Sequence, residues 1–160
     1  MTLAAPGKGP ALGVVAPFFL AAPVGLAAAA LLLATASADM LVAINAPRTV
    51  AITHAAVIGW LSMGIFGAVY QFGPAVLRGR LVATRLARIH YYLHATVVPV
   101  FVWALWQWEV RVMALAGVSL AASFVLFLIN AFPAIKPTLR GPATSRYLTA
   151  SLSLLVVTAG

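Results

Sequence analysis

The sequence predicts an all-α protein, a polytopic bundle of membrane-spanning helices with its N-terminus in the cytoplasm. Of its 160 residues, 64% are hydrophobic and only 8% are charged, and the mean hydropathy is +1.07. In a water-soluble domain about a quarter of the residues are charged, so this composition is suited to lipid. We expect one transmembrane helical domain over residues 1–160, surrounded by membrane lipid.

Four apolar stretches are long enough to cross a hydrocarbon core about 30 Å thick, which takes about 20 residues of helix. They lie at about 12–36, 50–74, 84–108 and 112–132. The first contains Pro17 and Pro23, which membrane helices tolerate where neighbouring groups satisfy the freed carbonyls. A further apolar segment at 147–159 is shorter than a span, so we expect it to lie along the interface or to be part of a longer membrane protein.

Basic residues indicate the orientation of these spans. The loop between the second and third spans holds Arg78, Arg80, Arg85 and Arg88. Because cytoplasmic loops are enriched in Lys and Arg, this loop should be cytoplasmic, and alternation places eight of the ten basic residues on the same side. The net charge of +8 therefore reflects membrane orientation and not a nucleic-acid partner. We expect the inner (plasma) membrane of a bacterium.

The residue types that the sequence lacks exclude several kinds of site. With no cysteine, the chain has no disulfide, no thiolate metal site and no covalent c-type haem attachment. Its two acidic residues, Asp39 and Glu109, lie outside the spans, so no carboxylate there completes an ordinary metal-hydrolase site. Chemistry within the membrane would depend on the three histidines, which are His54, His90 and His94.

A histidine at membrane depth is a functional candidate, because an ionisable group left unpaired in hydrocarbon is unfavourable. His90 and His94 are four residues apart and share a helix face, which suits two ligands of one metal ion, or a ligand and its hydrogen-bonding neighbour. Imidazoles in apolar surroundings suit haem iron better than zinc or calcium. For each histidine alone, the commoner role is a hydrogen bond to a carbonyl or hydroxyl of a neighbouring helix.

The second span is the most distinctive stretch, and its residues 53–74 read THAAVIGWLSMGIFGAVYQFGP. It supplies the three glycines Gly59, Gly64 and Gly67, ahead of a fourth at position 73. They would let either a porphyrin or another helix approach the backbone, and their spacing does not decide between these. Trp60 lies deeper in its span than the tryptophans at 103, 106 and 108, which fit the aromatic belt of a membrane interface.

A series of short motifs carries a resemblance to a known family. They are His54 followed by Gly59-Trp60, then Gly67-Ala-Val-Tyr70 and Pro74, then Ala87-Arg88-Ile-His90 and His94. Together they resemble small membrane proteins related to the catalytic subunit (subunit I) of the haem-copper oxidases, over about a quarter of the chain. The sequence departs from that pattern at Ile52, where the family has the first histidine of a His-x-His pair, and at Ala55, where leucine is usual.

The resemblance implies a haem of the b type, held without a covalent bond. Its first candidate ligand is His54, with His94 and His90 behind it and with Gly59, Trp60, Gly64 and Gly67 nearby on the second span. Copper is not expected, because three histidines are too few for a dihaem-copper centre. The function implied is electron transfer, or binding of oxygen or nitric oxide, in a respiratory chain, within a homo-oligomer or with further membrane subunits.

Two questions stay open at this stage. The incomplete ligand set leaves undecided whether the chain is itself an enzyme, despite its resemblance to oxidoreductases. The alternative function is that of a cofactor-free helical subunit or scaffold, whose histidines and glycines serve helix packing.

Depth in the membrane argues against a haem shared by two histidines of this chain. At 1.5 Å per residue, His54 lies about 7 Å from the outer end of its span, and His94 about 21 Å from the outer end of the next. We therefore expect the two side chains at levels about 14 Å apart, with a second subunit supplying the missing ligand.

Overall fold

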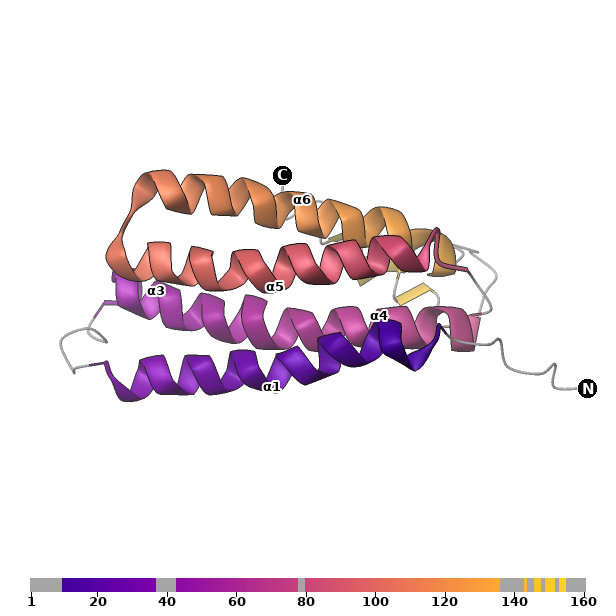
Figure 1. Cartoon of the computed structure of the whole chain (residues 1–160), viewed down its shortest axis with the longest axis horizontal. Coiled ribbons are helices and arrows are strands. Elements are labelled where there is room, and N and C mark those ends of the chain that lie inside the picture. Colours follow the sequence, from indigo (N-terminus) through magenta and orange to yellow (C-terminus); the bar gives the residue numbers. More distant parts are fainter. Residues whose placement is uncertain are drawn as a thin grey trace, which may run out of the picture.

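The computed structural model describes residues 10–36, 43–77 and 80–135, together with eight residues toward the C-terminus at 143, 146, 147, 149–151, 153 and 154. The described residues are mostly helical and contain no strand. Long helical spans lie side by side, each antiparallel to the next along the chain (Figure 1). The prediction of an all-α helical bundle is confirmed.

The spans begin and end within three residues of their predicted bounds. The first is α1 (Leu12–Ala34), the third is α5 (Thr84–Gln107) and the fourth is α6 (Val110–Ile135). The second consists of three successive helical segments, which are α3 (Pro47–His54), the π-helical η1 (Ala55–Leu61) and α4 (Ser62–Leu77). All four spans are long and apolar enough to cross a membrane. Of the predicted segment 147–159, the described residues are helical and the others lie outside the described part.

Arginines mark one end of the bundle, which we call the basic end. The connection between α4 and α5 carries Arg80, and the first turns of α5 carry Arg85 and Arg88. All three are exposed. Arg78 and residues 1–9, on which the predicted orientation also rests, lie outside the described residues.

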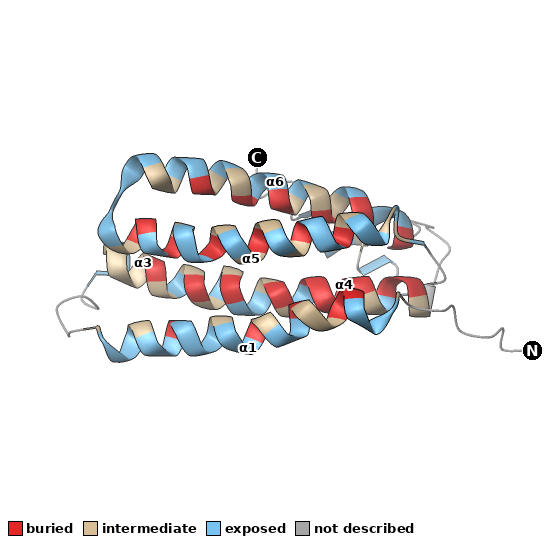
Figure 2. Ribbon diagram, viewed as in Figure 1, coloured by how far each residue is buried: buried red, intermediate tan, exposed pale blue. Residues whose placement is uncertain are grey.

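The surface of the bundle is apolar along its length. Large hydrophobic side chains are exposed on every span, for example Leu31 on α1 at 67% and Leu115 on α6 at 72%. Buried residues occupy the inner faces of the helices (Figure 2). Burying apolar surface is favourable by about 25 cal/mol per Å² in water, and lipid provides this burial where protein does not. The chain is therefore an integral membrane protein.

The core differs between the two ends of the bundle. Toward the basic end it is aromatic, and its large rings are Phe18, Phe66, Tyr70 and Phe127. Toward the opposite end it is aliphatic and small, with Ala29, Ala51, Val98, Val102 and Leu105. The aromatic part surrounds two of the three histidines, as described below.

Glycines allow α1 to pack directly on the second span. A Cβ atom on Gly25 would clash with the carbonyl group of Gly59 and lie 2.8 Å from the backbone nitrogen of Trp60. On Gly67 it would lie 3.1 Å from the Cβ of Phe18, another α1 residue. Gly64 has no such neighbour within 4 Å. Gly59 and Gly67 thus serve the packing of α1.

Replacing Gly25 by alanine should destabilise the bundle, because α1 must move away from η1 to admit the new methyl group. We expect the free energy of unfolding to fall by about 1–3 kcal/mol, measured by thermal or detergent-induced unfolding of the purified protein. The matched control is Gly64→Ala in the open position, which should be neutral or stabilise α4 by up to about 1 kcal/mol. Equal stability of the two variants would contradict the contact.

Candidate functional site

His94 lies on α5 inside the bundle, fully buried, with both ring nitrogens occupied. Its Nε2 is 3.2 Å from the carbonyl oxygen of Ile58 on η1, and its Nδ1 is 3.0 Å from the hydroxyl oxygen of Ser123 on α6. Because a carbonyl only accepts, Nε2 carries the proton and Nδ1 accepts from the Ser123 hydroxyl. A neutral imidazole thus joins three spans. Binding a metal ion through His94 would require one of these bonds to break.

The π-helical segment helps to provide the carbonyl that His94 uses. The backbone N–H of Ser62 bonds to the oxygen of Val57, five residues back, instead of to that of Ile58, as in an α-helix. The Ser62 hydroxyl donates to the same Val57 oxygen at 3.0 Å. The oxygen of Ile58 is thereby spared an α-helical bond, and it accepts from His94.

His90, one turn from His94 on α5, is enclosed by aromatic rings. Its ring centroid lies 4.6 Å from that of Phe66, 5.4 Å from that of Phe18 and 5.7 Å from that of Phe127. Its Nδ1 is 3.1 Å from the hydroxyl oxygen of Tyr70 on α4, whereas its Nε2 makes no hydrogen bond with any described residue. The side chain is 0% exposed, so no ligand reaches that nitrogen unless the aromatic side chains move.

Asn130 of α6 forms the polar contact nearest the basic end. Its side-chain oxygen accepts from the backbone N–H of Ala83 at 2.9 Å, and its backbone oxygen accepts from that of Val82 at 3.3 Å. Its Nδ2 is buried and completes no hydrogen bond among the described residues, although the amide adjoins the Tyr70 hydroxyl. Asn130 thus holds the start of α5 against α6.

His54 differs from the other two histidines, because it is half-buried and keeps one nitrogen open. Its Nδ1 is 2.7 Å from the carbonyl oxygen of Val50, one turn back on α3, and must therefore carry the proton. Its ring meets the Phe101 ring at a centroid distance of 5.5 Å. The Nε2 atom makes no hydrogen bond with a described residue. This is the state in which a histidine ligates a metal, oriented through its other nitrogen.

The depths of His54 and His94 differ by less than the sequence estimate of about 14 Å. His94 bonds to Ile58, four residues from His54, and the His54 ring contacts Phe101, seven residues from His94. At 1.5 Å per residue, these contacts place the two histidines about 6–10 Å apart in depth. The estimate was too large mainly because the second span begins at Pro47, three residues earlier than predicted. The two imidazoles have different partners: His94 bonds Ile58 and Ser123, whereas the His54 ring contacts Phe101.

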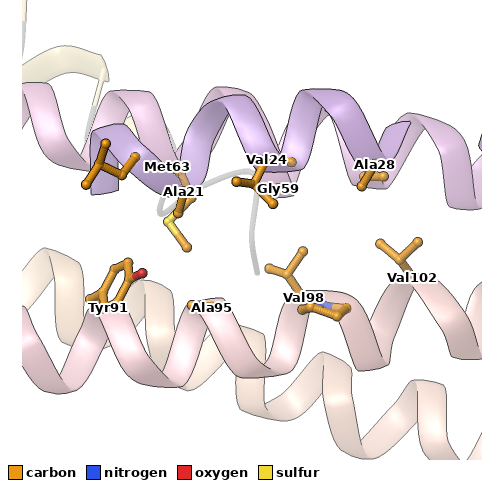
Figure 3. Close-up of a pocket in the computed structure, with 13 residues that line it drawn as sticks. Ala21, Val24, Ala28, Gly59, Met63, Tyr91, Ala95, Val98 and Val102 are labelled. Carbon is orange, nitrogen blue, oxygen red and sulfur yellow. The ribbon is translucent and has the colours of Figure 1, made fainter. Parts of the chain in front are cut away.

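The remaining predicted site residues do not gather around the histidines. Trp60 is 42% exposed on the outside of the bundle, and Gly59 and Gly67 face α1. A cavity of about 410 Å³ lies between α1 and α5, and none of the three histidines lines it (Figure 3). Within the described residues there is no group of three or more His, Cys, Asp or Glu side chains placed to hold a metal ion.

Two residues that bond the histidines or the start of α5, Ser123 and Asn130, were not singled out from the sequence. Tyr70 was named there as part of the Gly-x-x-Tyr motif, but its bond to His90 was not foreseen. Ser123 and Asn130 are polar residues within the very apolar fourth span, and this contrast is the signal that could have identified them.

Comparison with known proteins identifies no relative, since no family model, no curated protein and no solved structure matches the chain. The resemblance to subunit I of the haem-copper oxidases therefore stays a prediction.

The hydrogen bond between His94 and Ser123 can be measured by a double-mutant cycle. Ser123→Ala alone should lower the free energy of unfolding by about 0.5–2 kcal/mol. His94→Ala should lower it more, because it also frees the Ile58 carbonyl and leaves a cavity. The double variant should lose about 1 kcal/mol less unfolding free energy than the sum of the losses in the two single variants. Unfolding in mixed detergent micelles gives these energies.

The control for this cycle is Ser119→Ala on the same helix. The Ser119 hydroxyl is exposed and donates to the Leu115 carbonyl of its own helix at 2.9 Å, so its effect should add to that of His94→Ala. If the effect of Ser123→Ala on the free energy of unfolding also simply added to that of His94→Ala, the hydrogen bond between His94 and Ser123 would be refuted.

Proposed function

We propose that this chain is a haem-binding membrane protein, related to subunit I of the respiratory haem-copper oxidases, in which His54 would ligate the iron. One observation carries the proposal. The bond from His54 Nδ1 to the Val50 carbonyl, at 2.7 Å, orients the imidazole and leaves Nε2 as an unpaired base. An imidazole held in this way on a membrane helix, in a chain without cysteine, suits haem iron.

The other two histidines are less suited to be ligands. Both nitrogens of His94 are hydrogen-bonded, and the free nitrogen of His90 is closed in by Phe18, Phe66 and Phe127. These contacts support His54, over His94 and His90, as the ligand that this chain would supply.

The described residues supply only part of a haem site. His54 would hold the iron from one side, and Phe101 would limit rotation of the imidazole through its edge contact. The cavity between α1 and α5 does not reach His54, so the other walls of the porphyrin site and any second ligand come from a second copy, another membrane subunit or chain outside the described part. When bound, haem supplies one-electron transfer or binding of oxygen or nitric oxide.

A cofactor-free packing subunit is the second candidate function. It is favoured by the way in which His94 is used, since each of its nitrogens bonds a neighbouring span, and by the direct contact of Gly25 with Gly59. In that case His54 would be a solitary histidine bonded to its own helix.

Visible absorption spectra of the protein purified in detergent from haem-supplied cells test the proposal. The wild type should show a Soret band that shifts on reduction, and His54→Gly should lose the band because the axial nitrogen is gone. Adding free imidazole to His54→Gly should restore it, which a merely structural role of His54 would not allow. The matched control is Ser123→Ala, which perturbs His94 and should keep the band.

Two results would reject His54 as a ligand. One is a colourless wild-type protein, which would favour the packing subunit. The other is an unchanged spectrum in His54→Gly, which would direct the search to His90 or His94.

A further inference from the structure

The cavity between α1 and α5 is an apolar groove on the membrane-facing surface of the bundle. Figure 3 shows Val24 and Ala28 of α1 facing Ala95, Val98 and Val102 of α5 across it. Its volume of about 410 Å³ falls in the range of about 300–1,000 Å³ that is usual for small-molecule sites. Since the groove opens outward at membrane depth, its occupant must come from the membrane.

One end of the groove is polar. Tyr91 stands at that end of the row formed with Ala95, Val98 and Val102, where the spacing of three and four residues keeps all four on one face of α5 (Figure 3). The Tyr91 ring rests edge-on against Phe18 at a centroid distance of 5.2 Å. Its hydroxyl forms no hydrogen bond with a described residue.

Arg88 continues the same face of α5 by one turn toward the basic end. It is exposed and forms no ion pair within the part of the chain that the structure describes. Glu109, the described acidic residue, follows the opposite end of α5. The groove therefore has apolar walls and the Tyr91 hydroxyl at one end, and Arg88 lies beyond that end, one turn along the same face of α5.

We propose that this groove binds an acyl chain of an anionic phospholipid whose phosphate is held by Arg88 and the Tyr91 hydroxyl. From Arg88 to Val102 the row spans fourteen residues, or about 21 Å, which is more than half of a hydrocarbon core of about 30 Å. The part of this row that lines the groove, from Tyr91 to Val102, spans eleven residues or about 16.5 Å, close to the half-core of about 15 Å that an acyl chain of one leaflet covers. The excess of basic residues assigns the basic end to the cytoplasmic leaflet, where anionic lipids attract arginines.

An anionic lipid suits this groove better than a further protein helix because of its polar end. The row of groove residues on α5 continues to the exposed Arg88, which offers a cation to a phosphate. The walls also contain Gly25, held directly against Gly59, and alanines of the kind that allow close helix packing, so a second helix is the competing occupant that the test below distinguishes. The inference does not depend on haem binding, because no histidine lines the groove.

Native mass spectrometry of the purified full chain tests the assignment, with dioleoyl phosphatidylglycerol as the anionic probe and dioleoyl phosphatidylcholine as the neutral one. The wild type should retain one phosphatidylglycerol, with an affinity about fivefold or more above that for phosphatidylcholine, as expected for one basic residue at the headgroup. Arg88→Gln should remove most of this preference. The control Arg111→Gln makes the same charge change at the opposite end of the bundle and should keep it.

Filling the groove tests the position of the acyl chain. Ala95→Trp should reduce retention of phosphatidylglycerol at least tenfold. Ala95→Leu adds a smaller side chain that perturbs the packing less, and it should reduce retention by a smaller factor. Circular dichroism confirms that each variant is folded. Equal retention of both lipids by the wild type, equal effects of Arg88→Gln and Arg111→Gln, or unchanged binding in folded Ala95 variants would each overturn the proposal.

Discussion

A polar group placed in hydrocarbon must find its partner within the protein, and the bond between His94 and Ile58 is the point at which this bundle meets that requirement most directly. The π-helical segment spares a carbonyl, and an imidazole from another span donates to it. Ser123 completes the arrangement from a third span. Without a hydrophobic force between helices in lipid, such bonds and close packing fix how the spans are rotated about their axes.

The same requirement separates the three histidines into different roles. His94 is satisfied on both sides and serves as a joint between spans. His90 is held through Tyr70 and shielded by phenyl rings. Only His54 is tied to its own helix and keeps an open nitrogen. The histidine that joins three spans is thus a different one from the histidine whose Nε2 has no partner among the described residues.

Composition and charge were enough to predict the spans, because lipid requires long apolar helices whatever their detailed packing. They were not enough to predict the polar contacts. The i,i+4 spacing placed His90 and His94 on one face, but whether a carbonyl faces them depends on the local π-helical geometry of η1 and on the rotation of α6. Pro47 at the first turn of α3 marks the start of the second span. A span counted from Pro47 places His54 deeper in the membrane and therefore closer in depth to His94. The direct approach of α1 to Gly59 depends on Gly25, a residue that no motif or spacing in the first span distinguishes.

Asn130 has a consequence for how the protein is assembled. The backbone N–H groups of Val82 and Ala83, directly before α5, are bonded by this single residue near the end of α6, which for Ala83 lies 47 positions later in the chain. During synthesis the third span therefore emerges before the residue that anchors its start. The hydrogen bonds from Val82 and Ala83 to Asn130 form only when α5 and α6 are both present as a hairpin. Insertion of the fourth span therefore completes the hydrogen bonding at the start of the third.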